Sequence, residues 1–175
     1  MKFPFCPKCG NSAQPLVMDH QDVSACTNST CRFVLRPNSK PCASIVVAND
    51  LGEILLTTRS IDPDKGKLDL PGGFLQLGEH PYDGARREAR EELQVEIETI
   101  RVLGFAMDTY GPDGDSTLNI AVLARVESGI PMPTDEISEI VWVNPRNVDH
   151  SKLSFTNNSR IIGLYIEYLK SGGIC

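Results

Sequence analysis

Hydrophobic and polar positions along the chain predict strands interleaved with helices. Short apolar runs of strand length are separated by loops rich in Gly, Pro and Asp. These runs lie at residues 43–48, 53–59, 95–105, 117–126 and 140–143, and the polar loops that separate the last three lie at 108–116 and 128–136. The turn at residues 49–52 predicts that the first two runs form a hairpin.

Two stretches have the period of an amphipathic helix. In the first, Tyr82, Ala85, Ala89 and Leu93 follow one another at spacings of 3, 4 and 4, and Pro81 suits the first turn. The second covers residues 158–170 and closes the chain, with apolar residues on one face. Strands interleaved with two helices predict an α/β fold, with a mixed sheet between helices.

The chain divides unequally in composition and charge. Residues 36–41 are polar and rich in proline, which predicts a linker between a small domain at 1–37 and a main domain at 38–175. Five Lys and Arg against two Asp give residues 1–40 a formal charge of +3, which leaves −9 on the other 135 residues. Such an acidic domain would bind a phosphate substrate only with the help of cations.

No apolar run approaches the 18 residues of a membrane span, and the N-terminal residues lack the features of a signal peptide. We therefore expect a cytoplasmic protein with no membrane partner. The apolar fraction of 41% supports a hydrophobic core in the main domain.

Four cysteines in the small domain have the spacing of a metal site. Cys6 and Cys9 are separated by two residues, and Cys26 and Cys31 by four. Two such pairs offer four thiolates to a tetrahedral Zn²⁺, which would also supply folding energy to a segment with little core. The pattern therefore predicts a structural zinc ribbon, with disulfides or an iron–sulfur cluster as alternatives.

Three glutamates lie on one face of the first predicted helix. Glu88, Glu91 and Glu92 stand at i, i+3 and i+4, which places their Cβ atoms about 5–6 Å apart. Like charges at this spacing repel one another, and a bound divalent cation would turn the repulsion into attraction. The pattern therefore predicts a cation site on this face.

The stretch that contains these glutamates resembles the Nudix box, and every charged position of that motif is matched. Here the motif is written Gly73-x5-Glu79-x7-Arg87-Glu88-Ala89-x-Glu91-Glu92-x-Gln94-Val95. The departure is Gln94, where the family pattern has glycine just past the helix. Glycine there commonly serves a left-handed conformation, which glutamine reaches at about 1 kcal/mol unless the helix ends differently.

The resemblance implies a Nudix-type α/β/α sandwich and a Mg²⁺- or Mn²⁺-dependent enzyme that cleaves the diphosphate of a nucleoside diphosphate derivative. By analogy, Glu88, Glu91, Glu92 and the carbonyl group of Gly72 would bind the catalytic metal. The resemblance also implies that Glu79 pairs with Arg87 as a structural brace.

One carboxylate must act as general base, and Glu91 or Glu92 could do so. Family members also use a glutamate in a later loop, which suggests Glu136 here, with Asp135 and Glu139 as rivals. An ordinary acidic loop explains these residues equally well.

The substrate is less well defined. A four-cysteine ribbon before a Nudix domain is similar to the layout of NADH pyrophosphatases, but their downstream signature is missing here. We therefore expect an ADP-ribose or nucleotide-sugar substrate, with NADH or NAD as the alternative. Arg59, Phe74 and Tyr110 could contact its base or phosphates, and each has an ordinary packing or surface role as the alternative.

A function of another class is a nucleotide-sensing or nucleic-acid-binding module without hydrolysis, suggested by the basic ribbon. Four thiolates and one Zn²⁺ would lower the formal +3 of that segment to about +1, so we expect a small nucleotide partner and no nucleic acid. The ribbon could also serve as a homodimer contact.

Overall fold

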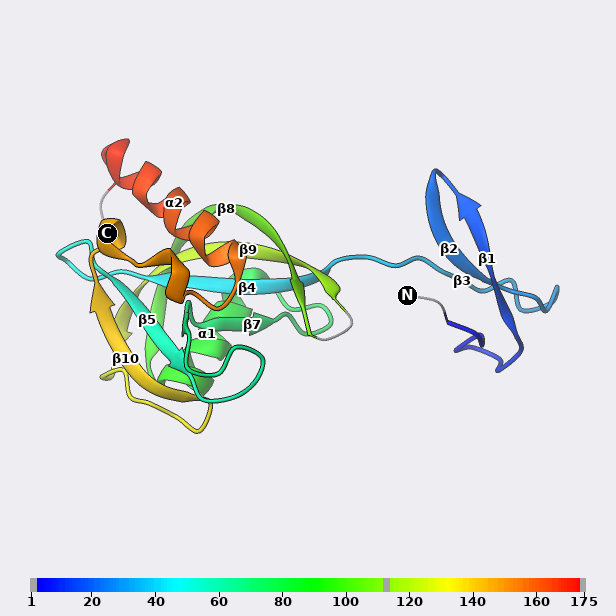
Figure 1. Cartoon of the computed structure of the whole chain (residues 1–175), viewed down its shortest axis with the longest axis horizontal. Helices are drawn as coiled ribbons and strands as arrows, with labels where there is room; N and C mark the ends of the chain where they lie inside the picture. The colour runs from blue at the N-terminus through cyan, green and yellow to red at the C-terminus, as the bar shows by residue number, and fades with distance from the viewer. Residues whose placement is uncertain (1–2, 112–113, 174–175) are drawn as a thin grey trace. The chain divides into compact units, whose positions relative to one another are not determined.

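The computed structural model describes residues 3–111 and 114–173 (Figure 1). Contacts between residues divide the chain into two compact units, Met1–Ser39 and Lys40–Cys175. Linker composition predicted the division two residues earlier, between 37 and 38. None of the helices in the described residues is long and apolar enough to cross a membrane.

The first unit is a small antiparallel sheet of three strands in the order β1-β2-β3. Its strands are β1 (Ala13–Met18), β2 (Gln21–Cys26) and β3 (Val34–Leu35). Cys6 and Val23 are its buried apolar residues, at 2% and 4% exposure, among the described part of the unit. So small a core buries too little apolar surface to hold the sheet together alone.

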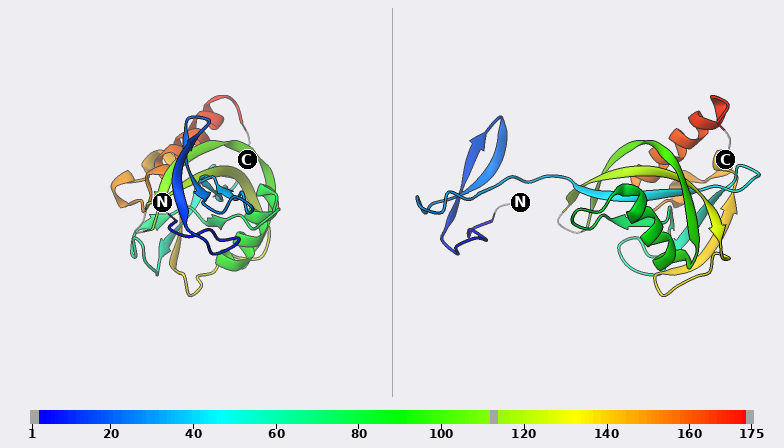
Figure 2. Two further views of the ribbon diagram at one scale, coloured as in Figure 1. Left: turned by 90° about the vertical axis from the view of Figure 1, so that its right-hand side faces the viewer. Right: turned by 180° about the vertical axis from the view of Figure 1, so that it is seen from behind.

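The second unit is built on two sheets (Figure 2). The four-stranded sheet has the order β7 (Gly72–Phe74), β4 (Lys40–Val47), β9 (Asp115–Ser128) and β8 (Glu96–Tyr110). The three-stranded sheet has the order β10 (Ile137–Val143), β5 (Ile54–Arg59) and β6 (Leu68–Asp69). β4 runs parallel to β9, and the other named pairs of this unit are antiparallel, so the first of these sheets is mixed.

Two helices cover opposite faces of these strands. Alternate residues of β4 such as Ile45 pack with α1 (Pro81–Leu93), while their neighbours such as Val46 pack with α2 (Thr156–Lys170). β5 and β9 divide in the same way, because successive side chains of a strand point to opposite faces. The predicted mixed sheet between helices is confirmed as an α/β/α sandwich. Two 3₁₀ turns, η1 (Pro145–Asn147) and η2 (His150–Lys152), precede α2.

The predicted hairpin of the first two apolar runs is wrong. Asn49 and Gly52 do form a tight turn, in which the Asn49 side chain accepts hydrogen bonds from two backbone N–H groups. A single bridge between Ala48 and Ile54 follows, and then β4 and β5 separate into different sheets. Both strands are apolar on both faces, so each is buried by pairing with distant strands between the helix layers.

The polar segment 108–116, predicted as a loop, is largely strand. β8 continues through Tyr110 and β9 begins at Asp115, with Asp108 opposite Thr117 in the same antiparallel ladder. Residues 112–113 of that segment lie outside the described part. The extension matters for the site, because it carries Asp108 and Tyr110 to the edge of a cavity.

Candidate active site

The helix that carries the three glutamates has a defined start and end. The ring Nδ1 of His80 accepts a hydrogen bond from the backbone N–H of Tyr82 at 3.2 Å, so this histidine caps the N-terminus of α1. Gln94 follows the last turn in the left-handed conformation, with φ 59° and ψ 34°. Its N–H donates to the carbonyl group of Arg90 at 3.2 Å. Glutamine thus occupies the conformation that glycine usually supplies.

The buried face of α1 determines where the glutamates lie. Ala85, Ala89 and Leu93 are fully buried against the sheet. Glu88 is largely buried, with its side chain 12% exposed, and Glu91 lies further out at 57%. The predicted cation face therefore lies along the side of the helix, between the core and solvent.

The glycine pair brings strand β7 and the helix into close approach. The N–H of Gly72 donates a hydrogen bond to Oε2 of Glu92 at 2.8 Å. A Cβ atom on Gly72 would lie 2.0 Å from the carbonyl oxygen of Ala43, and its φ of 142° favours glycine. A Cβ atom on Gly73 would lie 2.5 Å from a carboxylate oxygen of Glu88. Gly72 therefore needs glycine, and a side chain at Gly73 would displace the Glu88 carboxylate, whether or not the Gly72 carbonyl group binds metal.

Arg87 connects the loop before the helix to the glutamate face. Its guanidinium group donates to both carboxylate oxygens of Glu79 at 2.8 and 2.9 Å and to the carbonyl group of Phe74 at 3.0 Å. It also donates to Glu88 at 2.7 Å and to Glu91 at 2.9 Å. These contacts lower the pKa of Glu79 to about 2, chiefly through the hydrogen bonds from Arg87.

The inner part of the glutamate face favours neutral carboxyl groups in the absence of cations. Burial raises the pKa of Glu92 to about 8, and the negative charges of Glu88, Asp69 and Glu136 add to the rise, although the Gly72 N–H opposes it. Burial is also the main cause of the raised pKa of Glu88. A nearby cation would reverse this effect by favouring the charged carboxylates.

Glu136 lies beside the glutamates, although it is 44 positions away from Glu92 in the sequence. It lines a cavity of about 340 Å³ with the three helix glutamates and Asp135. Glu136 also lines the neighbouring cavity that contains Glu88 and Glu92. Its rival Glu139 lines neither of these two cavities and is exposed on β10.

The donor set on this face suits Mg²⁺ or Mn²⁺. Carboxylate oxygens are the ligands that hard divalent cations prefer, and the closely spaced negative charges are only partly neutralised by Arg87. Within the described residues, however, the one place where at least three ligand atoms gather within 4.8 Å is the cysteine cluster. Glu88 and Glu91 would therefore have to turn from Arg87 to share a cation.

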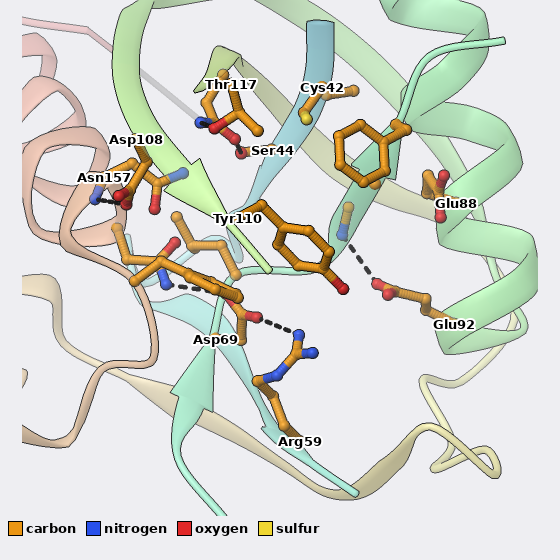
Figure 3. Close-up of a pocket in the computed structure, with 18 of the residues that line it drawn as sticks. Cys42, Ser44, Arg59, Asp69, Glu88, Glu92, Asp108, Tyr110, Thr117 and Asn157 are labelled. Carbon is orange, nitrogen blue, oxygen red and sulfur yellow. Dashed lines mark hydrogen bonds and ion pairs between the residues drawn. The ribbon is translucent and has the colours of Figure 1, made fainter. Parts of the chain in front are cut away.

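A cavity of about 210 Å³ adjoins the glutamate face (Figure 3). The structure brings Arg59, Phe74 and Tyr110 together in its lining. The rings of Phe74 and Tyr110 pack edge to face with their centroids 5.4 Å apart, and Phe155 lies 5.8 Å beyond Tyr110. The guanidinium group of Arg59 lies 5.1 Å from the ring centroid of Phe155 and forms an ion pair with Asp69 at 2.8 Å.

Several polar residues of this cavity were not predicted as site residues. They come from five elements, β4, β6, β8, β9 and α2, and they are Ser44, Asp69, Asp108, Thr117, Asn119, Asn157 and Asn158. One signal was present in the sequence, because Thr117 and Asn119 introduce polar side chains into an apolar strand. The others have no distinctive local pattern, and only the fold brings them to one place.

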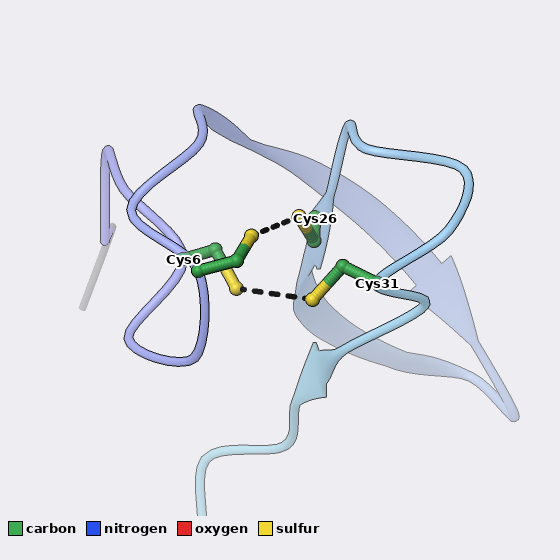
Figure 4. A group of neighbouring side chains, drawn as sticks. Cys6, Cys26 and Cys31 are labelled. Carbon is green, nitrogen blue, oxygen red and sulfur yellow. Dashed lines mark hydrogen bonds between the residues drawn. The ribbon is translucent and has the colours of Figure 1, made fainter.

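The four cysteines of the first unit converge (Figure 4). Their sulfur atoms lie within 4.8 Å of one another, with Cys6 and Cys31 at 3.8 Å and Cys9 and Cys26 at 3.5 Å. All four are free thiols, since a disulfide needs about 2.05 Å. A hydrogen bond from Asn11 is the main cause of the lowered pKa of Cys9, about 6, whereas burial raises the pKa of Cys26 to about 12. The arrangement is that of a metal-binding ribbon.

Together, the mixed sheet between two helices, the glycine pair and the glutamate face define an α/β/α hydrolase domain of the Nudix type. The NUDIX domain model matches residues 38–162, so the chain belongs to this family. Its fold is similar to a NUDIX hydrolase from Nitrosomonas europaea, with a TM-score of 0.77, 21% identity and coverage of 99% of this chain and 96% of that one. An ADP-ribose pyrophosphatase from Streptococcus suis matches with a TM-score of 0.58 and 20% identity, over 76% and 93% of the two chains.

Among curated relatives, the chain is similar to proteins named NAD-capped RNA hydrolase NudC. The protein from Mannheimia succiniciproducens is 32% identical over 79% of this chain and 51% of its own length. The protein from Vibrio atlanticus is 30% identical over 79% and 48%. The chain thus spans about half the length of these relatives.

Proposed function

We propose that the chain is a Mg²⁺- or Mn²⁺-dependent pyrophosphohydrolase that cleaves the diphosphate of a nucleoside diphosphate derivative, of the ADP-ribose or nucleotide-sugar type. The observation that carries the proposal is the continuity of the acidic face with an aromatic cavity. Glu88, Glu92 and Glu136 line the cavity that also holds Phe74 and Tyr110. A diphosphate at the glutamates would leave its nucleoside within reach of the two rings.

Each part of the site would have a separate task. Glu88, Glu91 and Glu92 would hold the divalent cation, which supplies positive charge to the diphosphate and lowers the pKa of an attacking water. Arg87 would remain paired with Glu79, which fixes the loop and the helix relative to one another. The substrate contacts of Arg59 would be limited, because Asp69 already accepts a hydrogen bond from its guanidinium group.

Glu136 is the stronger candidate for general base. It comes from the loop before β10, so it can move independently of the helix that would carry the metal ligands. It also lines both cavities, whereas Glu91 lines the outer one. A base on a separate element can approach the attacking water while the helix glutamates remain bound to the cation.

A second candidate substrate is an NAD-type dinucleotide, either NAD or NADH itself or the NAD cap of an RNA. The relatives named NAD-capped RNA hydrolase support it, because the similarity covers 79% of this chain in both NudC proteins compared above. ADP-ribose and NAD both contain an adenosine diphosphate group, so the same site residues would serve either of these two substrates.

The test is a substrate panel of ADP-ribose, a nucleotide sugar, NADH and an NAD-capped RNA, with Mg²⁺ or Mn²⁺. We expect nucleoside monophosphate release from at least one of them. Glu92→Gln should lower kcat by about 100-fold or more, because it removes a charge from the cation site. Glu127→Gln, an exposed glutamate at the end of β9, is the matched control and should keep full activity. No turnover on any substrate, or full activity of Glu92→Gln, would contradict the proposal.

For the cysteine cluster we propose Zn²⁺ with a structural role. Four thiols at this spacing suit a closed tetrahedral zinc site. The apolar core of the first unit is small, so metal binding would supply the free energy that the fold needs. Metal analysis of the purified protein should give one zinc per chain. Iron in place of zinc would overturn this proposal.

A further inference from the structure

Most of the charged side chains that line the cavity of Phe74 and Tyr110 are negative. Five of them are carboxylates, and they are Asp69, Glu88, Glu92, Asp108 and Glu136. Within the described residues, Arg59 is the one cationic side chain of this lining. In Figure 3, Asp108 and the two helix glutamates lie on opposite sides of Tyr110. Cations held by the glutamates would therefore supply positive charge at one end of the cavity only.

The positive charge of Arg59 is already balanced within the protein. Its Nη1 donates to Oδ2 of Asp69 at 2.8 Å, and its Nε donates to the carbonyl oxygen of Pro63 at 2.7 Å. The guanidinium group also lies 5.1 Å from the ring centroid of Phe155, and both side chains of the ion pair are largely buried. Arg59 cannot turn towards a further anion without leaving the buried Asp69 unpaired, which is costly.

A second cavity continues the end of the first cavity that lies away from the glutamates. It has a volume of about 610 Å³ and shares Asp108 and Phe155 with the first cavity. Asp62 and Asp64 add two carboxylates to its lining. Asp64 forms an ion pair with Lys67 at 2.7 Å, whereas Asp62 forms none with the described residues. A ligand that extends to this side therefore meets carboxylates, with no unpaired cationic side chain among the described residues of either lining.

The charge of the whole domain acts in the same direction. Residues 41–175 carry a formal charge of −9, since the chain total is −6 and residues 1–40 carry +3. Two phosphates at the glutamates would be neutralised by bound divalent cations. A third phosphate elsewhere on the substrate would lie beyond these cations, in a negative field that the protein does not compensate. Such a juxtaposition of like charges lowers the affinity and the rate of association.

This distinction divides the candidate substrates. ADP-ribose and NAD carry two phosphates, and both belong to the diphosphate that would bind at the glutamates. NADP carries a third phosphate on the 2′-oxygen of its adenosine. In an NAD-capped RNA, the 3′-oxygen of the adenosine is joined to the phosphate of the next nucleotide, and the rest of the RNA follows as a polyanion.

We propose that the site takes free nucleoside diphosphate derivatives such as ADP-ribose and NAD, and that its acidic end discriminates against substrates whose nucleoside carries a further phosphate. NAD-capped RNA belongs to the disfavoured class. The proposal rests on the proposed function and narrows its substrate class. It also separates this chain from the activity in the names of the NudC relatives, of whose length the chain spans about half.

The first test compares kcat/KM for ADP-ribose with that for its 2′-phosphate, and kcat/KM for NAD with those for NADP and a short NAD-capped RNA. The substrate without the further phosphate should be preferred by about 10-fold or more at low salt. Because salt screens the repulsion between charges, the preference should fall by about 3-fold or more in about 0.5 M NaCl. Equal use of the substrates, or a preference that salt leaves unchanged, would overturn the proposal.

Asp62→Lys tests the acidic end directly, because it replaces an exposed negative charge of the second cavity by a positive one. It should lower the preference by about 3-fold or more. Glu127→Lys is the matched control, since it makes the same change of charge at the exposed end of β9 that lies opposite the end with Thr117. This control should keep the wild-type preference. A preference unchanged in Asp62→Lys, or lowered equally by both variants, would overturn the assignment of the discrimination to this end of the site.

Calorimetry with AMP and with adenosine 2′,5′- and 3′,5′-bisphosphate, in the presence of Mg²⁺, gives the comparison without hydrolysis. If no substrate is cleaved but AMP binds about 10-fold or more tightly than both bisphosphates, the proposed function fails and the discrimination stands. If substrates are cleaved but either bisphosphate binds as tightly as AMP, the discrimination fails and the proposed function stands. Absence of both AMP binding and turnover would overturn the two proposals together.

Discussion

Glu88 occupies space that only glycine leaves free, because the missing side chain of Gly73 makes room for its carboxylate. The same carboxylate accepts a hydrogen bond from Arg87 at 2.7 Å. At the residue scale, the geometry of the site therefore depends on the absence of a side chain at Gly73 in β7 as well as on the glutamates of α1.

Replacement of Gly73 by alanine should affect the activity of the protein more than its stability. Gly73→Ala would place Cβ 2.5 Å from a Glu88 oxygen, so the carboxylate must move away. We expect activity on the best panel substrate to fall by about 10-fold or more, with a free energy of unfolding lowered by about 1–3 kcal/mol at most. Gly163→Ala in α2, where the new Cβ would meet no atom within 4 Å beyond the neighbouring helix backbone, is the control and should keep activity. Unchanged activity of Gly73→Ala would contradict the expectation.

The ion pair of Glu79 and Arg87 should make stability depend on pH in the acidic range. Arg87 and a backbone N–H group lower the pKa of Glu79 from 4.5 to about 2 in the folded protein. The Glu79 carboxylate binds a proton more readily in the unfolded chain than in the folded one. The contribution of the ion pair to the free energy of unfolding is therefore complete above about pH 5, and it is lost as the pH falls from 4.5 towards 2.

Glu79→Gln should accordingly be less stable than wild type by about 2 kcal/mol at pH 7, with a difference that shrinks below pH 4.5. Urea unfolding at a series of pH values measures it. Glu98→Gln breaks an ion pair with Arg125 in which both side chains are more than half exposed, so it should cost less than about 1 kcal/mol. A Glu79→Gln deficit that grows on acidification would refute the prediction.

At the scale of elements, the residue that follows α1 has a backbone conformation that it does not favour. Gln94 has φ 59°, and the left-handed region costs a residue with a side chain about 1–2 kcal/mol. The helix nevertheless ends there, because Val95 and Ile97 must be buried at the start of the next strand. Tertiary packing thus overrides the local preference of glutamine.

Gln94→Gly should therefore stabilise the protein, by about 0.5–1 kcal/mol once the greater freedom of glycine in the unfolded chain is counted. Chemical denaturation measures the change. Gln76→Gly is the matched control, since Gln76 has no positive φ and should lose stability on the same replacement. A Gln94→Gly variant no more stable than wild type would show that the cap is not strained.

At the scale of the whole molecule, the two units should respond separately to metal removal. The cysteine cluster lies in Met1–Ser39, while the core clusters around both helices lie in Lys40–Cys175. A chelator that removes zinc should abolish the dispersed NMR signals of the first unit and leave those of the second unit in place.

Cys9→Ser should have the same effect as the chelator, since it removes one ligand of four. Cys42→Ser is the control, because Cys42 is a buried thiol of β4 outside the cluster and its loss should leave the zinc content at one per chain. Dispersed signals from the first unit in metal-free protein would show that the ribbon folds without its metal.

Features that depend on short sequence separations could be predicted from the sequence. The buried stripe of α1 and the common face of Glu88, Glu91 and Glu92 follow from the helical period alone. The cysteine pairs follow from the small number of geometries that closely spaced thiols can adopt around a metal. The sequence thereby determined the fold class and the family.

The tertiary structure decided what depends on distant segments. The pairing of β4 with β9 joins residues 77 positions apart, and the approach of Glu136 to Glu92 joins residues 44 positions apart. The free energy that brings these residues together comes from burying the apolar faces of other elements. The sequence around each residue therefore contains no local signal of the contact. The sequence alone determined the acidic helix, and the fold decided which polar groups line the cavity beside it.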